Sequence, residues 1–79
     1  MEGLIRKIII GNDVKNGMAY QVGMKLKNGG IVNAIVFDEE HMYKHGFKRY
    51  LIYVKDEDGI SLWKAIDNMS CSVEFDLNF

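Results

Sequence analysis

Apolar and polar residues alternate along most of the chain, and this period of two is typical of β-strands. The clearest example is the segment of residues 18–27. Gly23 interrupts it, which predicts a bulge or a sharp bend in the middle of the strand. The residues expected on its core face are Met18, Tyr20, Val22, Met24 and Leu26.

Turn-forming residues separate the alternating segments. Asn28-Gly29 between two apolar runs predicts a tight hairpin, and Asp58-Gly59 predicts another. The expected strands cover residues 4–10, 18–27, 31–37, 47–55, 60–66 and 71–77. We therefore expect one all-β domain over residues 1–79, a small antiparallel barrel or two-layer sandwich of five to six strands. At most one short helical turn is expected, near residues 39–45.

The hairpin of residues 47–66 is expected to have one apolar face and one amphipathic face. If Asp58 and Gly59 form the centre of the turn, Val54 lies opposite Trp63. The face expected in the core then carries Tyr50, Ile52, Val54, Trp63 and Ala65. The second face carries Leu51, Tyr53, Lys55, Leu62, Lys64 and Ile66. If nothing covers this second face, it is a binding surface.

Composition narrows the function classes. The chain has 48% hydrophobic and 27% charged residues, which is typical of a globular protein. Eleven acidic residues balance ten basic ones, so the basic surplus of most nucleic-acid binders is missing. One cysteine and no secretory-type apolar segment favour a cytoplasmic protein without membrane contact. Eight lysines against two arginines suggest an AT-rich genome, such as a phage or mobile element.

Few residues suggest chemistry. His41 and His45 have the helical i,i+4 spacing at which two imidazoles share a metal ion, and Asp38, Glu39 and Glu40 precede them. They are weak metal candidates, because a polar loop that keeps its charges in water explains the same residues. Cys71 begins an alternating strand on its apolar side, so a small core residue is the simpler interpretation. We expect no enzymatic activity and no cofactor.

The expected function is a non-catalytic protein-interaction module, such as a small phage inhibitor or accessory protein that binds another protein. Self-association into a homo-oligomer is also expected, since a small domain gains stability by covering apolar surface. The candidate partner-binding residues are Leu51, Tyr53, Leu62, Lys64, Glu74 and Asp76. The alternative is a small nucleic-acid-binding barrel that uses Lys25, Lys27, Arg49 and Tyr50.

Overall fold

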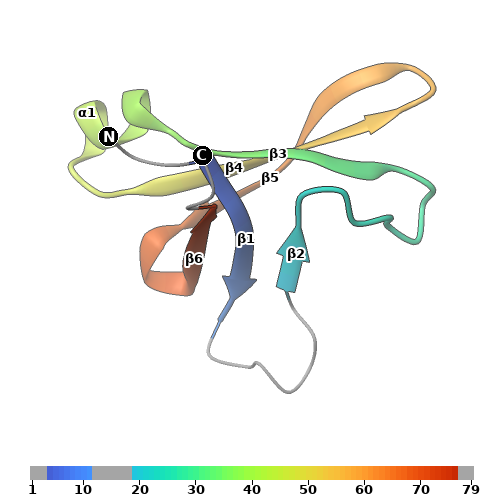
Figure 1. Ribbon diagram of the computed structural model, residues 1–79. Coiled ribbons are helices and arrows are strands. Elements are labelled where there is room, and N and C mark those ends of the chain that lie inside the picture. Colours follow the sequence, from blue (N-terminus) through green and yellow to red (C-terminus); the bar gives the residue numbers. More distant parts are fainter. Residues whose placement is uncertain (1–3, 12–18, 77–79) are drawn as a thin grey trace.

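Two three-stranded antiparallel sheets make up the fold (Figure 1). The computed structural model describes residues 4–11 and 19–76, and of Ser70 and Asp76 only the backbone. The first sheet has the order β2-β1-β6, from β2 (Ala19–Gln21), β1 (Leu4–Ile10) and β6 (Cys71–Asp76). The second has the order β3-β4-β5, from β3 (Ile31–Phe37), β4 (Arg49–Asp56) and β5 (Gly59–Asp67).

The strands of the first sheet run across those of the second in Figure 1. This arrangement confirms the all-β class and the two-layer sandwich. The described strands do not close into a barrel, so that alternative is not supported. A short helix, α1 (Glu39–His45), joins β3 to β4, and a 3-10 helix, η2 (Asn68–Ser70), joins β5 to β6.

The core lies between the two sheets, where β1 packs against β3. Ile8, Val32 and Ile52 are its most deeply buried side chains, with 0–1% of their surface exposed. Tyr20 and Trp63 close one side of the core with an edge-to-face ring contact, their centroids 4.9 Å apart. The other buried members are Ile5, Leu26, Ile35, Tyr50, Val54 and Ile66.

Bulges in three strands decide which apolar residues reach this core. The pairing register shifts so that Arg6, Asn33 and Trp63 each have no direct partner across the ladder. An extra residue reverses the side-chain alternation beyond it. Ile5 and Ile8, three positions apart, are therefore both buried, although strict alternation places them on opposite faces.

The prediction of one strand over residues 18–27 with a single core face is wrong. Only Ala19–Gln21 pairs with β1, and Met18 lies outside the described residues. At Gly23, φ is 95°, a value that glycine adopts without strain, and the chain bends there toward β3. Val22 and Met24 are consequently each 40% exposed. The tight turn around Asn28-Gly29 is confirmed, because the amide of Leu26 donates to the carbonyl of Gly30.

The register predicted for the second hairpin is also wrong. Asp56 pairs with Gly59, so the turn residues are Glu57 and Asp58, and Val54 lies opposite Ser61. Beyond the bulge at Trp63, Ile66 pairs with Tyr50 and is buried, which moves it from the predicted outer face into the core. Ala65, predicted to be in the core, is exposed.

The helix α1 lies at residues where at most one helical turn was expected, and it extends over seven residues. Asp38 caps its first turn by accepting a hydrogen bond from the backbone amide of His41 at 3.1 Å. Gly46 ends it in the left-handed conformation, with φ of 79°. Within the described ranges, no helix has the length and apolar character needed to cross a bilayer.

Candidate interaction surface

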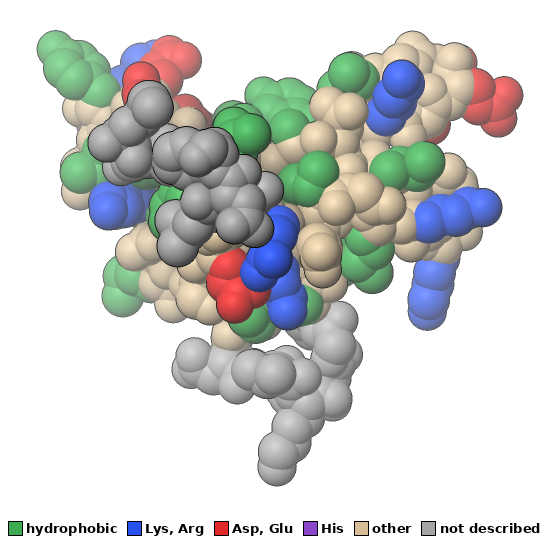
Figure 2. All heavy atoms as spheres, in the orientation of Figure 1, with side chains coloured by type: hydrophobic (Ala, Val, Ile, Leu, Met, Phe, Trp, Pro, Cys, Tyr) green, Lys and Arg blue, Asp and Glu red, His purple; other side chains and the backbone are tan. Residues whose placement is uncertain are grey.

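The β3-β4-β5 sheet has one face toward β1 and the core, and an opposite face that we call the outer face. Strand pairing sets its side chains in three rows across the sheet. The rows are Ile31–Lys55–Ile60, Ala34–Tyr53–Leu62 and Val36–Leu51–Ala65. Eight of these nine residues are hydrophobic, and Figure 2 shows hydrophobic side chains on the upper part of the molecule, where this sheet lies.

The outer face is open to water. Ile60 is 57% exposed, Leu62 52%, Ile31 46% and Val36 39%. Three strands about 4.8 Å apart and seven to nine residues long make a surface of roughly 14 Å by 25 Å, or about 350 Å². An apolar patch of that size falls within the range of functional patches on monomers, about 300–600 Å². Tyr53 lies in its middle row and is half-buried by its neighbours.

Charged residues lie at the two ends of the outer face. The exposed Lys55 lies in the first row, and the exposed Asp67 pairs with Arg49 beyond the last row. Neither Lys55 nor Asp67 takes part in an ion pair with another described residue. The Arg49 guanidinium is bound by Asp38, and the exposed Lys48 precedes Arg49, so this end carries charges of both signs.

The predicted partner-binding residues lie in three different places. Leu51, Tyr53 and Leu62 lie together on the outer face. Lys64 does not, because the bulge at Trp63 sets it opposite Ile52, with its ammonium 4.7 Å from the Trp63 ring centroid.

Glu74 and Asp76 belong to the other sheet, on β6. Glu74 is exposed and lies 3.9 Å from the cationic groups of Arg6 and Lys7. Of Asp76 the structure describes only the backbone, which pairs with Leu4. The structure therefore does not join these acidic residues to the outer face.

Sequence reasoning missed three large apolar contributors to the outer face: Ile31, Val36 and Ile60. Two of them come from β3, which the sequence analysis related only to the preceding segment. The strand order would have revealed these residues, because β3 and β5 both pair with β4 and therefore share its outer face. An alternating β3 next to β4 sets Val36 beside Leu51 and so extends the apolar surface.

The residues of the nucleic-acid alternative are dispersed. Lys25 and Lys27 are exposed on the turn between β2 and β3. Arg49 is half-buried, and its guanidinium lies 2.6 Å from the Asp38 carboxylate. Tyr50 is only 7% exposed, and its ring packs against Phe37 in the core, where it cannot stack on a base.

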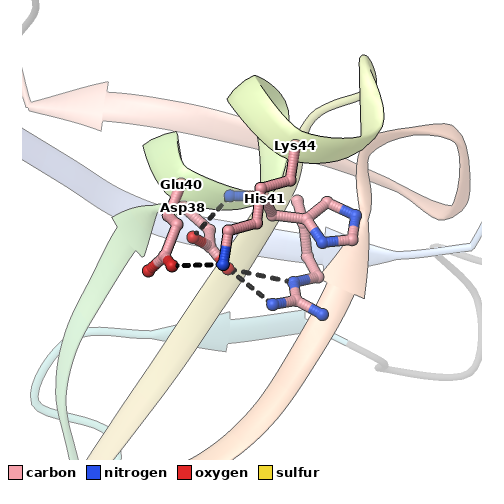
Figure 3. A network of polar contacts seen from close by, with 5 residues as sticks. Asp38, Glu40, His41 and Lys44 are labelled. Carbon is pink, nitrogen blue, oxygen red and sulfur yellow. Dashed lines mark hydrogen bonds and ion pairs between the residues drawn. The ribbon is translucent and has the colours of Figure 1, made fainter.

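The polar corner at the start of α1 is organised by Asp38 (Figure 3). One carboxylate oxygen accepts from the His41 amide, and the other accepts from Nε and Nη2 of Arg49, at 3.1 and 2.6 Å. The bonds from Arg49 and then the bond from the His41 amide hold the pKa of Asp38 below its usual value of 3.8. The exposed pair Glu40–Lys44, at 2.8 Å, adds little to stability.

The two histidines pack with an aromatic ring. The centroid of His41 lies 4.6 Å from that of His45 and 4.7 Å from that of Phe47. The Nε2 atom of His41 is buried and has no hydrogen-bond partner among the described residues. Within the described part of the chain, no three His, Cys, Asp or Glu side chains are grouped so that they can hold a metal ion.

Cys71 offers no activated nucleophile. Its Sγ lies 3.4 Å from the backbone carbonyl oxygen of Asp67, toward which it donates a weak hydrogen bond. Partial burial, and to a smaller extent the nearby charge of Asp67, raise the pKa of this thiol. A raised pKa keeps the group protonated at neutral pH, which is the less reactive form.

Comparisons with known proteins give no family. No protein-family model matches the chain, no curated protein matches it, and no solved structure matches its fold at a significant level.

Proposed function

We propose that this protein is a non-catalytic interaction module that binds a protein partner through its outer face. The observation that supports this most strongly is the group of exposed apolar side chains on three adjacent strands, among them Ile31, Ile60 and Leu62. Keeping them in water costs free energy that binding recovers, at about 25 cal/mol per Å² of buried apolar surface.

The layout of this surface resembles that of a protein interface. Such interfaces have an apolar centre, with aromatic residues enriched, and a polar rim. Here Tyr53 lies in the middle row, while Lys55 and Asp67 lie at the ends. A cytoplasmic inhibitor or accessory factor of a phage or mobile element is the kind of protein we propose.

The nucleic-acid alternative has weaker support. Lys25 and Lys27 are exposed and close in sequence, which favours it. Arg49 is neutralised by Asp38, however, and Tyr50 is buried in the core. Lys25 and Lys27 by themselves provide few phosphate contacts, and the net charge of −1 adds no attraction.

A capture experiment separates the two functions. The wild-type chain, Leu62→Lys and the matched control Leu4→Lys are immobilised and exposed to a lysate of the source cell, with and without nuclease, at two salt concentrations. Leu4 is 81% exposed, but it lies in β1 of the other sheet, so this control introduces the same charge away from the outer face.

We expect a protein band in stoichiometric amount with wild-type and Leu4→Lys but not with Leu62→Lys. The band should survive nuclease and higher salt, because burial of apolar surface is insensitive to screening. Equal capture by all three chains contradicts the outer face as the binding surface. Recovery of nucleic acid that disappears at higher salt establishes the alternative.

A further inference from the structure

We propose that Asn28 is a site of spontaneous deamidation, in which the side-chain amide is converted into a carboxylate. The site lies in the tight turn that precedes β3, and both Asn28 and the following Gly29 are exposed to water. The reaction needs only the turn and water, so it is independent of any partner bound at the outer face.

The nucleophile and the electrophile of this reaction are neighbours in the chain. The backbone nitrogen of Gly29 loses its proton to a base in water and attacks the side-chain carbonyl carbon, Cγ, of Asn28. The new N–Cγ bond closes a succinimide ring, the Cγ–Nδ2 bond breaks, and the side-chain nitrogen leaves as ammonia after taking up a proton from water. A water molecule then opens the ring at either carbonyl carbon. One opening gives aspartate, and the other gives isoaspartate, in which the backbone passes through the side chain.

The glycine at position 29 favours the attack. It has no side chain to keep its nitrogen away from Cγ of Asn28, and its wide range of backbone angles allows the ring to close. Its φ is 92°, which glycine adopts without strain. Apart from the chain neighbours of Gly29, no described atom lies within 4 Å of the position that a Cβ would take there, so the approach is open.

The turn also prepares the electrophile. The backbone amide of Gly30 donates a hydrogen bond to Oδ1 of Asn28 at 2.9 Å. Attack at Cγ moves negative charge onto Oδ1. A donor that already points at this atom stabilises the tetrahedral intermediate, as the donors of an oxyanion hole do.

One hydrogen bond opposes the reaction. The Gly29 amide donates to the carbonyl oxygen of Leu26 at 3.0 Å, and it must leave this acceptor before it loses its proton. The pairing beside the turn is limited to the isolated bridge between Lys25 and Ile31. Exposed turns of this kind open locally at a free energy well below that of global unfolding. We therefore expect the folded chain to react, at a rate that this opening limits.

The two other asparagines that the structure describes lack these features. Asn33 lies in β3 and is followed by Ala34, and Asn68 begins η2 and is followed by Met69. In both cases the next residue carries a side chain that crowds its own nitrogen. Among the described residues, no backbone amide donates to the side chain of Asn33 or Asn68.

The two products change the turn differently. Aspartate keeps the acceptor oxygen, and its bond from the Gly30 amide becomes charge-assisted. Isoaspartate lengthens the backbone between Lys27 and Gly29, which disrupts the bonds that join Leu26 to Gly29 and Gly30. We expect the isoaspartyl form to be the less stable product.

Mass spectrometry of the full chain tests the proposal. Wild type, Asn28→Gln and the control Asn33→Gln are incubated at neutral and at mildly alkaline pH in water enriched in heavy oxygen, with and without unfolding concentrations of urea. They are then digested with trypsin in ordinary water, so heavy oxygen marks only the carboxylates formed before digestion. Asn16, which is also followed by glycine and lies outside the described residues, falls in a different tryptic peptide. Circular dichroism checks that each chain without urea is folded.

We expect the label in the folded wild type to accumulate at position 28 about tenfold faster than at Asn33 and Asn68. One aligned donor to a developing oxyanion is worth about a hundredfold, and the bond from Gly29 to Leu26 offsets part of it. The rate should rise with pH, because the Gly29 nitrogen attacks only after losing its proton. Asn28→Gln should abolish the label at this position, since glutamine closes a larger ring more slowly, and Asn33→Gln should leave it unchanged.

Two results overturn the inference. One is a label at position 28 that does not exceed the labels at Asn33 and Asn68. The other is a label that appears at position 28 only in urea, which would show that the folded turn protects Asn28. The capture experiment with Leu62→Lys probes the outer face and not this turn, so either result leaves the proposed function to be decided on its own test.

Discussion

The two faces of the β3-β4-β5 sheet are both apolar, yet only one is covered. On the inner face Val32, Ile35 and Ile52 are buried beneath β1. On the outer face Ile31, Ile60 and Leu62 are roughly half exposed. Similar side chains on the same three strands therefore stabilise the fold on one side and leave apolar surface in water on the other.

This difference shows that hydrophobicity by itself does not identify a core. A buried face needs a second layer, and the described part of the chain has only one other sheet to provide it. The sheet β2-β1-β6 covers the inner face, and none of the described segments remains to cover the outer one. The surplus of apolar residues on the second side is what supports a role in binding.

The strongest test of this comparison deletes the same atoms from each face. Ile52 is fully buried and Ile60 is 57% exposed, so Ile52→Ala and Ile60→Ala form a matched pair. We expect Ile52→Ala to lower the free energy of unfolding by about 2–5 kcal/mol, from lost transfer energy and a cavity. Ile60→Ala should cost less than about 1 kcal/mol.

Urea unfolding at low protein concentration measures both values. A domain of this length has a total stability of roughly 4–12 kcal/mol, so the first change consumes a large share. Equal losses in the two variants contradict the assignment of the faces.

Much of the fold was predictable because the signals are local. Alternation located the strands, and Asn28-Gly29 located a tight turn. The bulges were not predictable, since an unpaired Arg6, Asn33 or Trp63 is fixed by its neighbours in space rather than by its own type. Each bulge reverses the alternation, which is why Ile66 and Ala65 were assigned to the wrong faces.

The site was predictable to the extent that it lies within one strand pair. Leu51, Tyr53 and Leu62 are brought together by the β4–β5 hairpin. Ile31 and Val36 come from β3, and only the strand order reveals that they extend the same surface. Lys64 was placed on it because the predicted register lacked the bulge.

We expect a smaller change in stability from the polar cluster around Asp38 at the start of α1. Asp38→Asn keeps a residue that caps α1 but removes the charge that binds Arg49. Because the folded-state pKa of Asp38 is lowered, its contribution is present above the unfolded-state value and is lost as the pH falls through the folded-state value.

The difference in urea midpoint between wild type and Asp38→Asn should therefore be full at pH 7 and shrink below about pH 4. Asp56→Asn, an exposed turn carboxylate, serves as the control and should show a smaller difference at pH 7. A difference for Asp38→Asn that stays constant from pH 7 to about pH 2 contradicts the role assigned to the Arg49 bond.

We expect the smallest change in stability at the edge of the inner face, where the Lys64 side chain lies near the rings of Trp63 and Tyr20. The Lys64 ammonium lies 4.7 Å from the Trp63 ring centroid and 5.8 Å from that of Tyr20. Such contacts are worth about 0.5–1 kcal/mol at exposed sites. Lys64→Ala should cost about that amount, and Lys64→Met should recover part of it, because a methionine stem still packs on the rings.

Trp63 provides its own readout, since it is the chain's one tryptophan. Removing Lys64 uncovers the indole, so iodide should quench its fluorescence more strongly in Lys64→Ala than in wild type. Lys55→Ala, which removes a lysine from the outer face, should leave the quenching close to wild type. Equal quenching in wild type and Lys64→Ala would show that the lysine stem does not cover the ring. The Trp63 edge of the inner face would then be exposed to water, as the apolar side chains of the outer face are.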